Sequence, residues 1–307
     1  MKSLFETASQ DSAARHQSPS QAAPQNSGRF PSWLHIKLPQ GGELFKTNAL
    51  LKANRLSLVC EEAKCPNRLE CYSRKTATFL ALGKACTRNC GFCDISYHKT
   101  PPLPDPGEPG RIASSAKALG LAHVVITMVA RDDLPDGGAV HLAEILRALR
   151  RELPKATVET LASDFAGNLD ALYILLRERP DVFNHNVETV PSLTPRIRHR
   201  ATYERSLHVL REAKQSGLCR KVKSGLMVGL GESEEELCRT LDDLKRAGCD
   251  SVTIGQYLQP RLRKLLVKRF VAPDEFKALE LYGLSIGIPQ VLAGPLVRSS
   301  YHADKLL

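Results

Sequence analysis

The sequence predicts an α/β fold in which a parallel sheet curves into a partial (β/α)6 TIM-like barrel. Short apolar, β-branched runs alternate with amphipathic stretches about six times along the 307 residues, as is typical of parallel strands joined by right-handed helical crossovers. Such units are too few to close an eight-unit barrel, so one side should stay open. The apolar (42%) and charged (25%) shares are those of a globular protein.

Each expected element follows from its hydrophobic period. Short runs rich in Val, Ile, Leu and Thr predict strands, at 76–83, 123–129, 157–162, 182–189, 223–229 and 251–258. Stretches with apolar residues three or four positions apart predict helices, at 111–120, 139–153, 169–179, 203–217, 233–248 and 273–287. The helix at 233–248 has the clearest ends, because Ser233 and Glu236 form a capping-box pattern and Gly248 follows its last turn.

We expect four segments along the chain. Residues 1–29 are rich in Ser, Gln, Ala and Pro and should be disordered, because they offer too little apolar surface to offset the entropy of ordering. Residues 30–75 form an N-terminal extension with three cysteines, 76–290 the partial barrel, and 291–307 a C-terminal segment. The two extensions should cover the open side of the barrel.

The formal net charge of +10 favours an acidic partner, although a solvated basic face is an equally good explanation. Basic residues gather at 196–200 and 260–269. Nucleic acid gains little support, because the chain has one Trp and no interleaving of aromatic with basic residues. No apolar run suits a membrane span or a secretory signal, so we expect no membrane partner and a cytoplasmic location. In that reducing compartment, clustered cysteines are expected to be metal or redox ligands.

Six of the nine cysteines fall in two triplets within 34 residues. The first triplet is Cys60, Cys65 and Cys71, and the second, spaced C-x-x-x-C-x-x-C, is Cys86, Cys90 and Cys93. The second follows the first predicted strand, at the edge of the sheet where α/β proteins place their sites. Three thiolates suit a [4Fe–4S] cluster with one open iron. The alternative is a zinc site in which His98 is the fourth ligand.

The second triplet resembles the signature of the radical S-adenosylmethionine superfamily, in which Phe92 matches the aromatic residue before the last cysteine. The resemblance implies a [4Fe–4S] cluster that binds and reductively cleaves S-adenosylmethionine. It also implies cofactor contacts from Gly137 and Gly138, which follow the second strand. Asn186 and Glu188 stand at the end of the fourth predicted strand, where polar side chains often contact a ligand, so we expect them to bind the ribose or amino group of the cofactor. For the two glycines, a plain turn is the alternative.

The first triplet is similar to the auxiliary-cluster motif of the lipoyl synthase family, and further motifs match in order: CPN, TATF, RDDLPDGGA, NHNVET, SGLMVGLGE, TIGQYLQP and RSSYHA. The resemblance covers 31–304. It implies a second [4Fe–4S] cluster, held by Cys60, Cys65, Cys71 and Ser300. It also implies radical insertion of sulfur at C6 and C8 of an octanoyl-lysine.

The partners implied are an octanoylated lipoyl carrier domain of acidic character, an iron–sulfur carrier protein and an electron donor. Three alternatives stay open: a tRNA methylthiotransferase-like enzyme with two clusters, a zinc-stabilised nucleic-acid binder, and a redox carrier with two clusters. The segment 260–266 is more basic than its counterpart in the family, and its role is not given by the resemblance.

Overall fold

A computed structural model describes residues 30–35, 56–73 and 78–300. Its centre is a seven-stranded parallel sheet in which each strand lies beside the next one along the chain. The strands are β1 (Thr78–Ala81), β4 (His123–Met128), β5 (Thr157–Leu161), β6 (Val182–Asn184), β7 (Lys221–Val228), β8 (Ser251–Gln256) and β9 (Gln290–Gly294). This arrangement confirms the predicted partial barrel.

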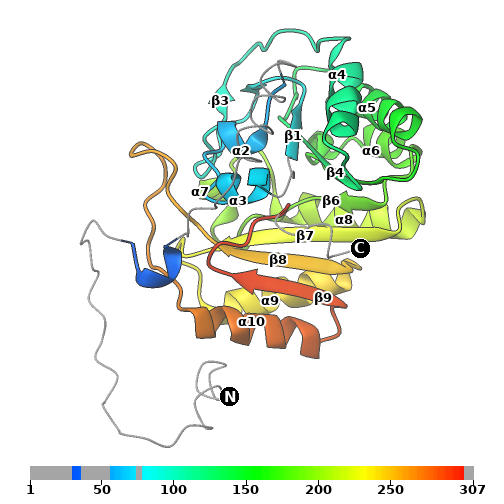
Figure 1. The fold of residues 1–307 in the computed structure, drawn as a ribbon. Coiled ribbons are helices and arrows are strands. Elements are labelled where there is room, and N and C mark those ends of the chain that lie inside the picture. The colour runs from blue at the N-terminus through cyan, green and yellow to red at the C-terminus, as the bar shows by residue number, and fades with distance from the viewer. Residues whose placement is uncertain (1–29, 36–55, 74–77, 301–307) are drawn as a thin grey trace, which may run out of the picture.

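Helices follow the strands and lie along the outside of the curved sheet (Figure 1). They are α4 (Glu108–Ala118), α5 (Ala139–Glu152), α6 (Leu169–Leu176), α8 (Tyr203–Ser216), α9 (Glu234–Arg246) and α10 (Pro273–Ser285), with the short η3 (Phe165–Gly167) and α7 (Thr194–Ile197) between them. The capping box at the start of α9 is confirmed, because Ser233 accepts from the amide of Glu236. No helix in the described part of the chain is both long and apolar enough to cross a membrane.

Two strands of the main sheet differ from the sequence prediction. The seventh strand, β9, was not predicted; it is a short half-buried run that ends in glycine, and it crosses the expected segment boundary at residue 290. β6 ends at Asn184, well before the predicted end at 189, because the chain turns away from the ladder and Glu188 takes a left-handed conformation (φ 66°). Only a single bridge, from Glu188 to Leu226, continues the pairing with β7.

The N-terminal extension covers the edge of β1. Leu58 pairs antiparallel with Phe79, and the amide of Leu80 donates to the carbonyl of Ser57 at 2.9 Å. The extension then forms α2 (Val59–Glu62) and α3 (Arg68–Ser73), and farther upstream the short η2 (Ser32–Leu34). The predicted disordered tail, 1–29, lies outside the described residues.

The last described residues, 295–300, form what we call the C-terminal strap, which passes back across β8 and β7 (Figure 1). The approach is so close that a Cβ on Gly255 of β8 would lie 2.1 Å from the carbonyl oxygen of Val297. A Cβ on Gly225 of β7 would lie 3.2 Å from the hydroxyl of Ser299. Only glycine leaves room for a backbone crossing of this kind.

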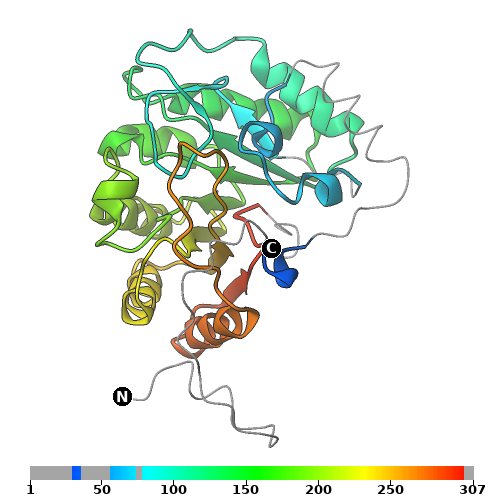
Figure 2. The same ribbon diagram turned by 90° about the vertical axis from the view of Figure 1, so that its left-hand side faces the viewer.

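The connection between β8 and α10 contains the basic residues noted above, and we call residues 259–269 the basic loop. Figure 2 shows this segment, in orange, projecting from the ends of the strands. The loop has no regular secondary structure. The basic loop therefore projects above the sheet without belonging to a strand or a helix.

A buried ion pair spans the interior of the sheet. Lys223 on β7 donates to both carboxylate oxygens of Glu159 on β5, at 3.0 and 3.2 Å, across the intervening strand β6. Both side chains are 1% exposed. Asn184 donates to the same carboxylate at 2.8 Å. Burial alone would raise the pKa of Glu159, but Lys223, His123 and Asn184 together hold it below its usual value.

Lys223→Met should lower the free energy of unfolding by about 3–5 kcal/mol, because it leaves the Glu159 carboxylate buried without its cation. Lys223→Met/Glu159→Gln should recover part of the loss, since the neutral amide still accepts from Asn184. Lys117→Met, which breaks an exposed pair, is the matched control and should change little. Urea titration followed by circular dichroism measures all three. Equal stability of the Lys223 and Lys117 variants would contradict the prediction.

Candidate functional site

The second cysteine triplet lies in a loop, residues 86–93, that is closed at its base by a small ladder. This cluster loop begins after β1 and is flanked by β2 (Ala85–Cys86) and β3 (Ser96–Tyr97), which pair in parallel. The amide of His98 donates to the carbonyl of Cys86 at 2.9 Å. His98 itself is exposed. The loop therefore stands at the carboxyl edge of the sheet, where the sequence predicted it.

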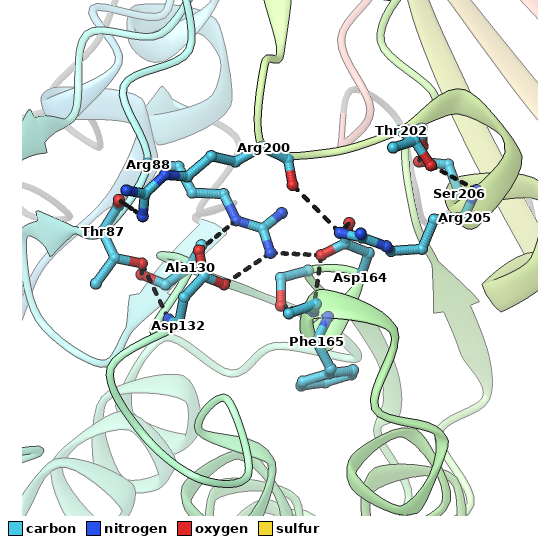
Figure 3. Close-up of polar contacts among 12 residues, drawn as sticks. Thr87, Arg88, Ala130, Asp132, Asp164, Phe165, Arg200, Thr202, Arg205 and Ser206 are labelled. Carbon is cyan, nitrogen blue, oxygen red and sulfur yellow. Dashed lines mark hydrogen bonds and ion pairs between the residues drawn. The ribbon is translucent and has the colours of Figure 1, made fainter. Parts of the chain in front are cut away.

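Arg88, inside the cluster loop, is held by two carboxylates (Figure 3). Its guanidinium donates to both oxygens of Asp132, at 2.8 and 2.7 Å, and to Asp164 at 2.6 Å. Asp132 follows β4 and Asp164 follows β5, so one side chain ties the loop to two strand ends. Arg205 of α8 reaches the second oxygen of Asp164 at 3.3 Å.

This network consists of buried, oppositely charged groups. The Arg88 side chain is 6% exposed and that of Asp164 is fully buried. Burial alone would raise the pKa of Asp164, but the charge of Arg88 lowers it to about 2. The adjoining Thr87 adds a further tie, because its hydroxyl donates to the carbonyl of Ala130 at 3.0 Å and accepts from the amide of Asp132. The start of the loop is thus fixed by charge and by hydrogen bonds.

The other end of the cluster loop is fixed by packing against the basic loop and α7. The amide of Gly91 donates to the carbonyl of Ile197 at 2.9 Å, and the amide of Leu265 donates to the carbonyl of Gly91 at 3.1 Å. A Cβ on Gly91 would lie 2.7 Å from the Leu265 side chain. Phe92 is half-buried against a small apolar cluster that includes Ile197 and Tyr257. In this structure, Phe92 therefore supports the loop by packing.

The first cysteine triplet lies in the N-terminal extension, with Cys60 on α2, Cys65 in the turn that follows, and Cys71 on α3. The strap meets this extension directly, because Asn67 donates to the carbonyl of Leu296 at 2.7 Å. Arg298, the next residue but one, is close enough to Cys65 for their charges to interact. The strap therefore brings the C-terminal motif to the first triplet.

The strap also reaches the residues that follow β6. Asn186 donates to the hydroxyl of Ser299 at 2.7 Å and to the carboxylate of Glu188 at 3.1 Å. Glu188 is half-buried. Loss of water around its carboxylate raises its pKa, and its charge acts on the thiols of Cys90 and Cys93. The strap thus contacts the turn after β6, and the cluster loop lies near enough for the charge of Glu188 to act on it; we call this place the mouth. Ser300 is half-buried beside Ser299, and residues 301–303 of the same motif lie outside the described residues.

An acceptor at this mouth has no partner among the described residues: the amide oxygen of Asn186 is buried and makes no hydrogen bond. A buried polar atom without a partner is costly, and it is a common sign of a missing ligand. His185, by contrast, has both ring nitrogens within hydrogen-bond distance of Ala162 and Ser206. Burial lowers its pKa to about 4, so it is a neutral structural residue.

Gly137 and Gly138 form the tight turn before α5, both with left-handed backbone conformations (φ 60° and 89°). Asp136 caps this helix, since its carboxylate accepts from the amides of Gly138 and Val140 at 3.0 and 2.8 Å. A Cβ on Gly138 would lie 2.5 Å from the side chain of Leu82. The turn and its close packing explain both glycines, and a cofactor contact from them stays a prediction.

The donor set of the two triplets fits iron–sulfur chemistry. All six cysteines are reduced thiols, and thiolates are the ligands that such clusters take. Burial raises the pKa of Cys60 and Cys90 to about 11 and that of Cys93 to about 12, so these sulfurs lie in surroundings of low polarity. Within the described ranges, no three His, Cys, Asp or Glu side chains converge as ligands of a single metal ion must.

Sequence reasoning missed two contributors to the site. Arg88 was passed over because the cysteines around it carried the motif, and its two partners lie 44 and 76 positions away. Arg298 was interpreted only as part of a motif, whereas in the structure it is half-buried and its charge acts on the thiol of Cys65. The local signal that could have identified Arg88 is its position between two cysteines of the cluster motif.

Comparison with known proteins gives consistent results. The model of the family described as the Radical SAM superfamily matches residues 80–244. The chain is 61% identical to a lipoyl synthase of Protochlamydia amoebophila, over 91% of this chain and 87% of that one. It is 55% identical to a lipoyl synthase of Chlamydia muridarum, over 94% of each chain.

Among solved structures, the chain resembles Streptococcus suis SuiB bound to S-adenosylmethionine, with a TM-score of 0.56 and 16% identity over 70% of this chain and 49% of that one. It also resembles the FeFe-hydrogenase maturase HydG of Carboxydothermus hydrogenoformans, with a TM-score of 0.55 and 18% identity over 85% of this chain and 61% of that one. At these identities, the two structures support the fold alone.

Arg88→Met should lower the free energy of unfolding by about 3 kcal/mol, at the low end of the cost of breaking a buried pair, because Asp164 would stay buried with only Arg205, at 3.3 Å, as its cation. Amide hydrogen exchange of the cluster loop should quicken. Arg147→Met, which breaks an exposed pair with Glu178, is the control and should do neither.

The difference in the free energy of unfolding between wild type and Arg88→Met should depend on pH. The pKa of Asp164 is about 2 in the folded chain, against an ordinary value of about 4 in the unfolded one. The stabilisation is therefore complete above about pH 4 and is lost as pH falls towards 2. The stability gap between wild type and Arg88→Met should narrow over that window. A stability difference that stays constant as pH falls from about 4 towards 2 would contradict the assignment of Arg88 as the partner of Asp164.

Proposed function

The chain belongs to the lipoyl synthase family of the radical S-adenosylmethionine superfamily, and on this premise we propose which residues perform its chemistry. That chemistry is the insertion of two sulfur atoms, at C6 and C8, into a protein-bound N6-octanoyl-lysine to give N6-lipoyl-lysine. The observation that supports the residue assignment most is that the strap contacts both the N-terminal extension, which carries the first triplet, and the turn after β6, whose Glu188 acts on the thiols of the second.

Cys86, Cys90 and Cys93 would hold the cluster that binds S-adenosylmethionine. When bound, the cofactor and this cluster supply a carbon-centred radical that can break an unactivated C–H bond, and a second cluster supplies the sulfur. Asn186 presents an acceptor with no partner among the described residues, and Glu188 a half-buried carboxylate, at the same mouth, which suits the hydroxyl and ammonium groups of the cofactor. Phe92, Gly137 and Gly138 would shape the site by packing and by backbone approach.

Cys60, Cys65 and Cys71 would hold the second cluster, and we propose that a serine hydroxyl of the strap is its fourth ligand. The family resemblance indicates Ser300. The hydroxyl of its neighbour Ser299 already accepts from Asn186, which lies outside the N-terminal extension, so Ser300 is the strap serine left for the first triplet. A hydroxyl is a harder ligand than a thiolate and binds iron less firmly, which suits a cluster that is taken apart in each cycle.

We further propose the partners and the compartment. The substrate protein is an octanoylated lipoyl carrier domain, an electron donor reduces the first cluster, and an iron–sulfur carrier restores the second. A cytoplasmic location would keep the six ligand thiols reduced. The boundaries at 29, 75 and 290 stay predictions, with β9 joining the C-terminal segment to the sheet.

Reconstituted protein incubated with reductant, S-adenosylmethionine and an octanoyl-lysyl peptide should yield peptide that has gained two sulfur atoms, measured by mass spectrometry. Cys86→Ala should abolish both this product and 5′-deoxyadenosine. Cys65→Ala should abolish the product but still release 5′-deoxyadenosine, because the first triplet is intact. Cys238→Ala, on the outer helix α9, is the control and should retain both. Lipoyl product from Cys65→Ala would refute the division of roles.

Ser299→Ala and Ser300→Ala form a matched pair that tests the oxygen ligand. Ser300→Ala should lose lipoyl product, and in a Cys86→Ala background, which keeps only the first triplet's cluster, it should alter the visible absorption. Ser299→Ala should leave the absorption of that background unchanged. The reverse pattern would assign the ligand to Ser299, and unchanged spectra in both variants would exclude a strap serine as a ligand of the cluster.

A further inference from the structure

The basic loop is attached to the cluster loop along its inner side. Leu265 packs against Gly91, and its amide donates to the Gly91 carbonyl at 3.1 Å. Lys264 donates to Asn89 at 3.2 Å and to the carbonyl of Cys90 at 3.4 Å. Whatever binds the outer side of the basic loop is therefore held beside the second triplet.

The outer side of the basic loop exposes apolar surface. Leu262 is 94% exposed and Leu266 is 66% exposed, the two highest values among the exposed large apolar side chains apart from Leu103. Both stand on the segment that projects from the molecule in Figures 1 and 2. Large apolar side chains gathered at one exposed place commonly mark a site of interaction.

The same segment carries positive charge that the molecule does not neutralise. Residues 251–273, a range that includes the basic loop, contain five basic side chains and no Asp or Glu. Arg261 pairs with Asp94, and Arg269 pairs with Glu275. Within the described residues, the remaining three, Arg263, Lys264 and Lys268, have no carboxylate at ion-pair distance. An acidic partner would supply the missing counter-charges.

A pocket joins this surface to the cluster loop. It has a volume of about 440 Å³ and lies between the two loops, lined by Asn89, Gly91, Arg261, Arg263, Lys264 and Leu265. Its lining thus combines three cationic residues of the basic loop with the two residues on either side of Cys90.

We propose that Leu262, Arg263, Leu266 and Lys268 form the docking surface for the acidic protein that carries the acyl-lysine. This inference rests on the proposed function. Leucines flanked by cations suit an acidic protein face with a small apolar spot, since apolar anchors with a charged rim are typical of protein interfaces. A single-stranded nucleic acid would instead call for aromatic side chains on which bases stack, and the basic loop has none between 259 and 269.

Arg263→Glu/Lys268→Glu should raise the KM for an octanoylated lipoyl carrier domain at least tenfold at low salt, with kcat unchanged. Lys264 is left intact because it also holds the cluster loop. Leu262→Ser/Leu266→Ser should also raise this KM, and the increase should be the same at low and at high salt. Arg151→Glu/Lys155→Glu is the matched control, because both residues are exposed near the end of α5, at the opposite edge of the sheet. It should leave the KM unchanged.

The short octanoyl-lysyl peptide separates this inference from the function on which it rests. All variants should convert the peptide at the wild-type rate. Wild type that fails on the peptide would refute the proposed function, whereas loop variants whose carrier-domain KM stays within twofold of wild type would refute only the docking surface. Loop variants that lose binding of a labelled single-stranded RNA while their carrier-domain KM is unchanged would assign the surface to nucleic acid and overturn the proposal.

Discussion

The structure depends on the close passage of the C-terminal strap over two glycines of the sheet. Val297 lies against Gly255 on β8 and Ser299 lies beside Gly225 on β7, at separations that leave no room for a Cβ. Along this path, the strap contacts Asn67 of the N-terminal extension and then Asn186 after β6. Two segments from opposite ends of the chain are thereby joined across the open side of the barrel.

Buried charges are compensated both in the body of the sheet and beside the cluster loop. In the body, Lys223 and Glu159 neutralise each other, and at the base of the cluster loop Arg88 is satisfied by Asp132 and Asp164. Compensation of this kind fixes backbone positions, because removing either partner leaves a buried charge. The amide oxygen of Asn186 differs from these groups, since it is a neutral acceptor at the mouth and has no partner among the described residues.

Much of this arrangement could be predicted from the sequence, and the reason differs between its parts. The strands and helices followed from local hydrophobic period, and the capping box at Ser233 placed one helix end correctly. The cysteine spacing placed a ligand loop after the first strand. β9 escaped notice because it is short and only partly buried, so it lacks a strong apolar run.

The contacts that join distant segments could not be read from the sequence. Arg88 and Asp164 are 76 positions apart, and Asn67 and Leu296 are 229 apart, so no local pattern links them. For the same reason, the sequence could name both serines of the strap but could not show which one turns inward. Cysteine spacing identifies ligands that are close along the chain. The residues that position those ligands can be identified only from the fold.

The crossing at Gly225 and Gly255 also bears on how such a chain tolerates genetic change. Neither position offers a functional group, yet at Gly255 even one added methyl would collide with the strap's main chain. Replacement of Gly255 would displace the strap, although every thiol would still be present. The hydrogen atom that glycine carries in place of a side chain is therefore required at this position, and a search confined to reactive side chains would pass over it.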